Sequence, residues 1–179
     1  MSLGGDEIMT LILGAIVDSQ SVILAADSRI DGRSGPPPFA THEKMFVRTQ
    51  VGILTSGSAQ GLDVPAIIQT GLPPNADLQA AIIFMRREFG ACADMHSIVG
   101  GLDGQNQARL FRINRATSDE LKDPAPKLWR SFGAGVDSVD LTHPAHIGLT
   151  LDQMRNELRH ARSRPGIGPP FKYLIISPA

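Results

Sequence analysis

The chain has 179 residues, 42% of them hydrophobic, which is the length of one ordinary domain with enough apolar surface for a core. Seventeen basic residues against eighteen acidic ones leave a net charge of −1, so no strong field attracts nucleic acid or an anionic membrane. The single cysteine, Cys92, excludes an internal disulfide framework and a thiolate metal cage, and it fits a reducing compartment.

The N-terminal segment predicts a buried hairpin. Its apolar run, from Met9 to Val17, is too short to cross a membrane, and no basic segment of a signal peptide precedes it. We therefore expect a cytoplasmic protein without a membrane or nucleic-acid partner. The stretches 10–17 and 21–26 are apolar and rich in β-branched residues, and the polar residues 18–20 between them form the turn.

A proline-rich loop and two short strands come next. Residues 31–41 contain two glycines and the prolines 36–38, which cannot donate ladder hydrogen bonds, so they form a loop. Strands are expected at 44–48 and 51–55, and the second leads into Ser56-Gly57-Ser58.

The remaining two thirds alternate between helices and strands. Asp77 is expected to cap a helix whose buried stripe ends at Phe89. Strands at 96–102 and 107–113 flank an Asp103-Gly104 turn. A strand at 128–132, a helix opened by a capping box of Thr150 and Gln153, and a strand at 171–177 complete the chain.

The order of these elements predicts the fold class. Hairpins, then helices, then hairpins argue against a doubly wound parallel sheet, which needs strictly alternating strands and helices. We expect an α+β fold in which two antiparallel sheets are covered by helices. One domain spans residues 1–179, and residues 1–9 form an N-terminal extension.

Three segments, 9–29, 41–44 and 52–59, resemble the first third of proteasome β subunits and of their simpler bacterial relatives. In that family a threonine opens the first strand, Asp-Ser-Arg ends the second, a lysine begins the third, and a glycine-rich segment ends the fourth. Thr10, Asp27-Ser28-Arg29, Lys44 and Ser56-Gly57-Ser58 follow in the same order. The resemblance implies an N-terminal-nucleophile hydrolase fold, a four-layer α-β-β-α sandwich.

The resemblance also implies a catalytic site without metal or cofactor. Thr10 would be the nucleophile, with its own α-amine as the base, because an α-amine titrates near neutral pH. Lys44 would tune the site by its charge, and Asp27 would hold Lys44. Ser56, Gly57 and Ser58 would form the oxyanion and substrate-binding segment, where a small residue lets the backbone N–H approach closely.

The sequence departs from the family pattern at several points. Valine ends Gly133-Ala-Gly-Val136 where the family has a serine, and no aspartate stands near Pro165-Gly166. Pro65 interrupts a helix that is normally longer, so that helix should start late or bend. Thr10 can use its amine only if it becomes the N-terminus. Methionine removal would expose it if synthesis begins at Met9, and self-cleavage before Thr10 would be needed if synthesis begins at Met1.

Three functional interpretations follow. The first is a threonine-type peptidase or amidohydrolase that acts on peptides or proteins once Thr10 is the N-terminus. It would be a homo-oligomer such as a ring, as the Met and Phe side chains of Leu78–Phe89 also suggest; a regulatory ATPase is unknown. The second is a catalytically inactive assembly or binding subunit. The third is a nucleotide-binding protein that uses Ser56–Ser58 as a phosphate loop.

Structural alternatives exist for each candidate residue. Thr10 could simply begin a strand, and Asp27 with Lys44 could form a structural ion pair. His143 and His146 read as solvated loop residues because no third metal ligand is near in sequence. The basic run from Arg155 to Arg164 reads as the polar face of the last helix.

Overall fold

The computed structural model describes residues 10–29, 43–57, 59, 61–115, 117–132, 135–163 and 167–178. Its first sheet is built around the predicted hairpin of β1 (Ile12–Asp18) and β2 (Ser21–Ala26). The strands β8 (Lys127–Ser131), β9 (Val136–Asp140) and β10 (Lys172–Ile176) complete it in the order β10-β2-β1-β8-β9. All neighbouring strands are antiparallel.

The second sheet also has five antiparallel strands. They are β3 (Met45–Val47), β4 (Val51–Gly57), β5 (Met95–Leu102), β6 (Ala108–Asn114) and β7 (Thr117–Glu120), in that order. At the predicted Asp103-Gly104 turn, the Asp103 carboxylate accepts hydrogen bonds from the N–H groups of Gln105 and Gln107. That side chain thereby fixes the β5–β6 hairpin.

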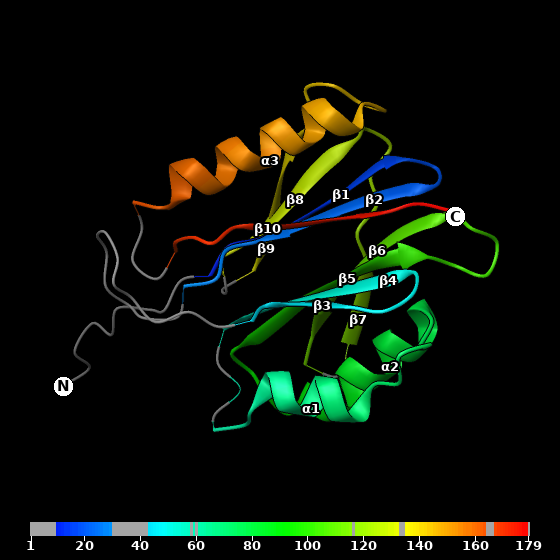
Figure 1. Cartoon of the computed structure of the whole chain (residues 1–179), viewed down its shortest axis with the longest axis vertical. Helices are drawn as coiled ribbons and strands as arrows, with labels where there is room; N and C mark the ends of the chain where they lie inside the picture. The colour runs from blue at the N-terminus through cyan, green and yellow to red at the C-terminus, as the bar shows by residue number, and fades with distance from the viewer. Residues whose placement is uncertain are drawn as a thin grey trace.

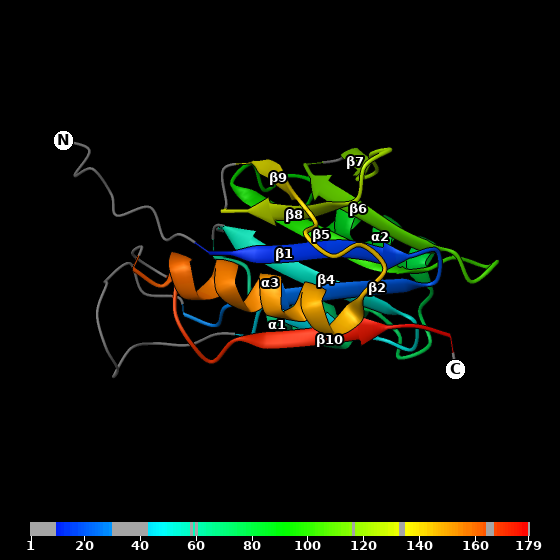
Figure 2. The same cartoon turned by 90° about the horizontal axis from the view of Figure 1, so that it is seen from above.

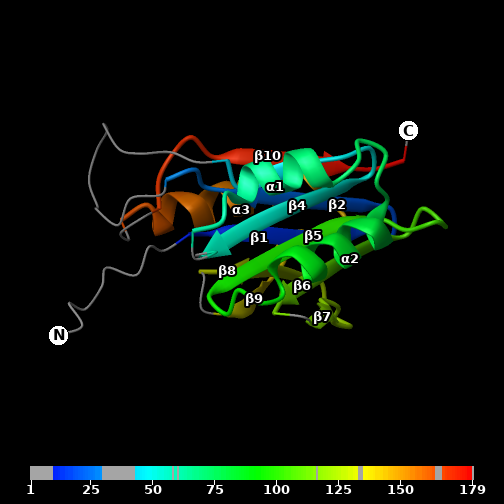
Figure 3. The same cartoon turned by 90° about the horizontal axis from the view of Figure 1, so that it is seen from below.

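Three helices lie on the outer faces of the sheets. Helix α3 (Ile147–Ala161) lies on the first sheet (Figures 1 and 2). Helices α1 (Val64–Gly71) and α2 (Leu78–Phe89) lie on the second (Figure 3). Asp77 caps α2 as predicted, because its carboxylate accepts a hydrogen bond of 2.8 Å from Ala80 N.

The core follows the alternation of side chains along the strands. Ile12, Leu24, Leu54, Ile98 and Leu110 face the space between the sheets and are 0% exposed. The alternate residues of the same strands pack outward, against α3 on one side and against α1 and α2 on the other. This double burial explains why β1 and β2 read as continuous apolar runs.

The predicted four-layer α-β-β-α sandwich is wrong. The described residues form ten strands but only three helices, of 8, 12 and 15 residues. A five-stranded sheet is about 20 Å wide and a helix about 10 Å, so the single helix α3 leaves much of the first sheet without helical cover. The molecule is mainly a two-sheet β structure. The prediction failed because the sequence pattern indicates where helices are but not how much of a sheet they cover.

The last helix starts earlier than predicted. His146 is its N-cap, and the His146 Nδ1 atom accepts a hydrogen bond of 3.1 Å from Leu149 N. Thr150 is instead buried inside α3, and the Gln153 side chain bonds to Thr142 and to the carbonyl of Asp140. The capping-box prediction is therefore wrong, because the N-cap acceptor is the imidazole nitrogen of His146 and not the hydroxyl of Thr150.

Two elements, β7 and β9, had no sequence prediction of their own, and α1 is the helix that Pro65 was expected to start late or bend. Pro65 stands in the first turn of α1, where its missing N–H is harmless, so the proline begins this short helix. The edge strands β7 and β9 are polar, which hides the apolar alternation expected of strands. The predicted loop at 31–41 lies outside the described residues.

Candidate functional site

Four chain segments come together at one end of the two sheets. Thr10 directly precedes Leu11 and β1, Asp27 follows β2, Lys44 precedes β3, and Ser56-Gly57 ends β4. Antiparallel pairing brings the start of β1 beside the end of β2, where Asp27 N donates to Leu11 O over 3.2 Å. It likewise brings Lys44 beside the end of β4, where Thr55 N donates to Lys44 O over 2.9 Å.

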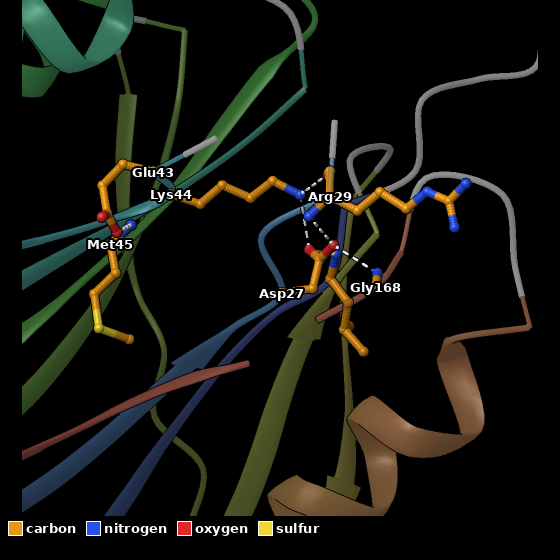
Figure 4. Close-up of polar contacts among 7 residues, drawn as sticks. Asp27, Arg29, Glu43, Lys44, Met45 and Gly168 are labelled. Atoms are coloured by element: carbon orange, nitrogen blue, oxygen red, sulfur yellow. Dashed lines mark hydrogen bonds and ion pairs between the residues drawn. The ribbon is translucent and has the colours of Figure 1, made fainter. Parts of the chain in front are cut away.

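The Asp27 carboxylate is the centre of this arrangement (Figure 4). Its Oδ1 atom accepts from Lys44 Nζ at 2.9 Å and from Leu11 N at 3.1 Å. Its Oδ2 atom accepts from Arg29 N and from Gly168 N, both at 3.1 Å. Four donors from four separate places in the chain therefore hold one carboxylate, which is 1% exposed as a residue.

Lys44 links the second sheet to the first through this carboxylate. It is 4% exposed, and its ammonium also donates to the backbone carbonyl of Arg29. The side chain is therefore held with its charge inside the molecule, at the end of the inter-sheet layer. A buried cation survives there because an ionised partner and a carbonyl replace its hydration.

Thr10 is the chain neighbour of Leu11, whose backbone N–H binds the Asp27 carboxylate. It is 3% exposed, and the N–H of the next residue, Leu11, shares the Asp27 Oδ1 atom with the Lys44 ammonium. Leu11 packs toward α3, so alternation places Thr10 on the opposite face, the one that Ile12 shares with the inter-sheet core. The structure brings Thr10, Asp27 and Lys44 into one region; their catalytic roles stay predictions.

Burial dominates the electrostatics of the pair. It lowers the pKa of Lys44 below the ordinary 10.5, and the Asp27 charge opposes this shift. It also raises the pKa of Asp27, against the Lys44 charge and the N–H groups of Gly168 and Leu11. The ammonium is thus less firmly protonated than a surface lysine.

The glycine-rich segment has a backbone that only glycine accommodates. Gly57 has a φ of +87°, and a Cβ added there would lie 1.9 Å from the carbonyl oxygen of Asp94. Ser56 is buried in β4, whereas Ser58 lies outside the described residues. The segment ends β4, and residues 58–63 that lead to α1 contain no lysine, so the phosphate-loop interpretation lacks the residue that would contact the phosphates.

The sequence did not reveal two contributors to this end of the molecule. Gly168 precedes β10 and reaches Asp27 through its backbone N–H, and nothing in a glycine signals such a role. His96 lies in β5 opposite Ser56 and is 6% exposed. Pro165 and Gly166, where an aspartate was sought, lie outside the described residues, as do Gly133 and Ala134; Val136 begins β9.

Metal and membrane features are also absent from the described part of the chain. No group of three or more His, Cys, Asp or Glu side chains is placed there to hold a metal ion. None of the helices in that part is long and apolar enough to span a membrane.

Comparison with known proteins gives similarity of structure only. No family model matches the chain, and no curated protein matches it in sequence. Anbu from Hyphomicrobium sp. strain MC1 is similar at a TM-score of 0.62 and 20% identity, over 94% of this chain and 82% of that one. Its Gly-1 mutant reaches 0.67 and 18%, over 94% and 81%. Anbu from Yersinia bercovieri, described as an ancestral beta-subunit, gives 0.67 and 16% with the same coverage.

These findings correct the family assignment. The motif order suggested membership of the proteasome β-subunit family, but no family model supports it, and the structural identities of 16–20% show a shared fold alone. The short motifs could not carry a family assignment, because each consists of common residues. What stands is a fold similar to that of Anbu.

Proposed function

We propose that this chain is an amide hydrolase that cleaves peptide bonds with Thr10 as nucleophile, once Thr10 is the N-terminal residue. One observation carries the proposal: the buried Lys44 ammonium and the N–H that follows Thr10 share one oxygen of Asp27. A structural ion pair has no need of a threonine beside it, whereas a threonine nucleophile needs a nearby positive charge to favour its alkoxide.

The reaction proceeds in two balanced steps. The Thr10 α-amine accepts the hydroxyl proton while Oγ1 attacks the substrate carbonyl carbon. The amide C–N bond breaks, the proton passes to the leaving amine, and the acyl group remains on Oγ1 as an ester. Water then gives a proton to the same α-amine and attacks the ester, which releases the acid and restores the hydroxyl.

Other residues of the site support these steps. The Lys44 charge stabilises the developing alkoxide and keeps the α-amine unprotonated at neutral pH. Asp27 holds Lys44 in place. The N–H of Gly57 is the oxyanion donor we favour, because the absent side chain lets a substrate oxygen approach the backbone.

The test compares two forms of the protein on small peptide-amide reporters. The form starting at Met1 should be inactive, because its Thr10 amine is in a peptide bond. The form starting at Thr10 should release the reporter amine. When treated with a β-lactone, it should also gain the mass of that label on Thr10. Thr10→Ala should abolish both signals, and Lys44→Ala should lower turnover by at least about 100-fold while circular dichroism stays unchanged.

Lack of labelling and turnover by a folded Thr10-initiated protein would refute the proposal. The chain would then be a non-catalytic assembly or binding subunit. Two departures from the family pattern favour that interpretation: Val136 stands where a serine is expected, and no aspartate stands near Pro165-Gly166.

A further inference from the structure

Three polar side chains form a transverse row on neighbouring strands of the second sheet. Ser56 of β4 pairs directly with His96 of β5, and His96 pairs directly with Asn114 of β6. Directly paired residues of antiparallel strands project their side chains from the same face, with Cβ atoms about 5 Å apart. We call Ser56, His96 and Asn114 the polar row.

The polar row faces the space between the two sheets. Leu54 and Ile98 lie two residues from Ser56 and His96 along their strands, and Leu110 lies four residues from Asn114; all three belong to the inter-sheet core. A Cβ on Gly14 of the first sheet would lie 3.0 Å from Leu110 and 3.3 Å from Ile98. Because side chains alternate with a period of two, the row points toward the first sheet as well.

The polar row also lies at the Thr10 end of the sandwich. In β5, Gly100 lies against Val22 and Leu24, toward the end of the first sheet remote from Thr10. His96 is four residues away in the other direction, toward Ile12 and Thr10. Ser56 directly precedes Gly57, whose N–H we assign to the oxyanion.

Each member of the row has a buried polar atom without a hydrogen-bond partner. These atoms are Ser56 Oγ, His96 Nδ1 and Asn114 Oδ1, and Arg112 Nε, two residues from Asn114 on β6, is a further unpartnered donor. Ser56 and His96 are only 3% and 6% exposed. Buried polar atoms nearly always have partners, and these three in a single row are groups that a polar ligand can satisfy together.

The chemistry of the row indicates an uncharged ligand. Burial lowers the pKa of His96, the nearby Arg112 charge lowers it further, and Asp94 opposes both. A neutral imidazole and a hydroxyl can each donate or accept, whereas Asn114 Oδ1 only accepts. A carboxylate would offer Asn114 Oδ1 no donor, and Arg112 disfavours another cation. A planar carboxamide offers both an acceptor and a donor.

We propose that the polar row binds a carboxamide side chain of the substrate, that of glutamine or asparagine, next to the bond cleaved at Thr10. This inference rests on the proposed function for its location. The row then determines specificity without taking part in bond breaking, and its unpartnered atoms are satisfied only when the matching side chain enters.

The first test uses the full chain and does not need activity. Histidine-selective NMR should show His96 ring resonances, identified by His96→Leu, moving on addition of acetyl-glutamine methylamide. Acetyl-leucine methylamide should leave them unmoved, and Ser56→Ala should weaken the glutamine response at least threefold. No response in the full chain or the Thr10-initiated form would overturn the inference.

The second test uses turnover by the Thr10-initiated form. Reporters with glutamine before the scissile bond should be preferred to leucine reporters by at least tenfold in kcat/KM. Ser56→Ala or His96→Leu should remove that preference. The control is Ser97→Ala, because Ser97 is buried next to His96 but projects from the opposite face of β5.

The two tests separate the inference from the proposed function. A glutamine-specific NMR response without any turnover would keep the polar row as a carboxamide site and reject the hydrolase. Turnover without a glutamine preference would keep the hydrolase and reject the carboxamide site. A glutamine preference that survives both Ser56→Ala and His96→Leu would also reject the carboxamide site.

Discussion

Asp27 shows how one residue can organise a site at the junction of two sheets. Its carboxylate collects donors from the segments before β1, after β2, before β3 and before β10. Each of these segments is a loop end whose position would otherwise depend on its strand alone. A shared buried acceptor holds them together, because leaving any of these donors unpaired would cost about 1–3 kcal/mol.

The pH dependence of turnover should report the state of Lys44. Burial lowers the pKa of Lys44 below 10.5, so its neutral form appears at a lower pH than for a surface lysine. Because the α-amine base stays active at high pH, the rate of the Thr10-initiated form should fall on the alkaline side when Lys44 loses its proton. We expect this fall below pH 10.5 in a kcat profile.

Lys44→Arg provides the matching variant. A guanidinium does not deprotonate in this range, so the alkaline fall should disappear even though the changed geometry lowers the rate. An unchanged alkaline fall in Lys44→Arg would assign it to another group.

Gly57 and Gly61 offer a matched pair of substitutions. Both have a φ of +87°, but a Cβ at Gly57 would overlap Asp94 O, whereas no atom of the described residues lies within 4 Å of one at Gly61. Gly61→Ala should therefore lose only the left-handed backbone preference, about 1–2 kcal/mol. Gly57→Ala should lose about 1–3 kcal/mol more, measured by urea unfolding. Equal losses would contradict the close approach of Asp94.

At the scale of elements, the helices are held by side chains that fit their ends. Asp63 and Asp77 accept from the first turns of α1 and α2. The Arg48 guanidinium donates to the carbonyls of Ile68 and Leu72, at the end of α1. These contacts matter most for α1, because a helix of 8 residues is too short to be stable alone.

His146 should be a stabilising cap of α3. His146→Ala removes the acceptor of the Leu149 N–H and should lower the free energy of unfolding by about 0.5–2 kcal/mol. His143→Ala is the control, because His143 stands in the same exposed segment outside the helix cap. Thermal and urea unfolding measure both, and equal effects would exclude a capping role.

At the scale of the molecule, the Met and Phe side chains of α2 that were expected to form an oligomer contact lie in the core. Phe84, Met85 and Phe89 of α2 are at most 4% exposed and pack into the core, so they cannot form the contact surface predicted from them. The exposed apolar residues are elsewhere, and include Ile83 at 49% on α2 and the edge-strand residues Val47 and Ile175 at 49% and 44%.

A homo-oligomer remains our prediction on this new basis. The edge strands β3 and β10 present unpaired backbone groups beside Val47 and Ile175, which is a surface that proteins usually cover. Light scattering should give a mass several times 19.2 kDa. The double variant Val47→Lys/Ile175→Lys should lower it. A monomer at all working concentrations would contradict the prediction.

Much of the secondary structure followed from the sequence alone, because it depends on local physics. Apolar runs, turn residues and the cap at Asp77 predicted the β1–β2 and β5–β6 hairpins and α2 to within a few residues. The order of Thr10, Asp27 and Lys44 also pointed to one site. The polar edge strands and the imidazole cap of α3 were missed, since neither produces a recognisable local pattern.

Only the tertiary structure decided which groups meet. Gly168 lies far from Asp27 in sequence, and its contact is made through the backbone, which is the same for every non-proline residue. His96 became informative only when strand register placed it beside Ser56 and Asn114, facing the inter-sheet layer. The incomplete helical cover of the first sheet was likewise decided only by the tertiary structure. Long-range pairing and layer packing depend on contacts between distant segments, which residue patterns do not contain.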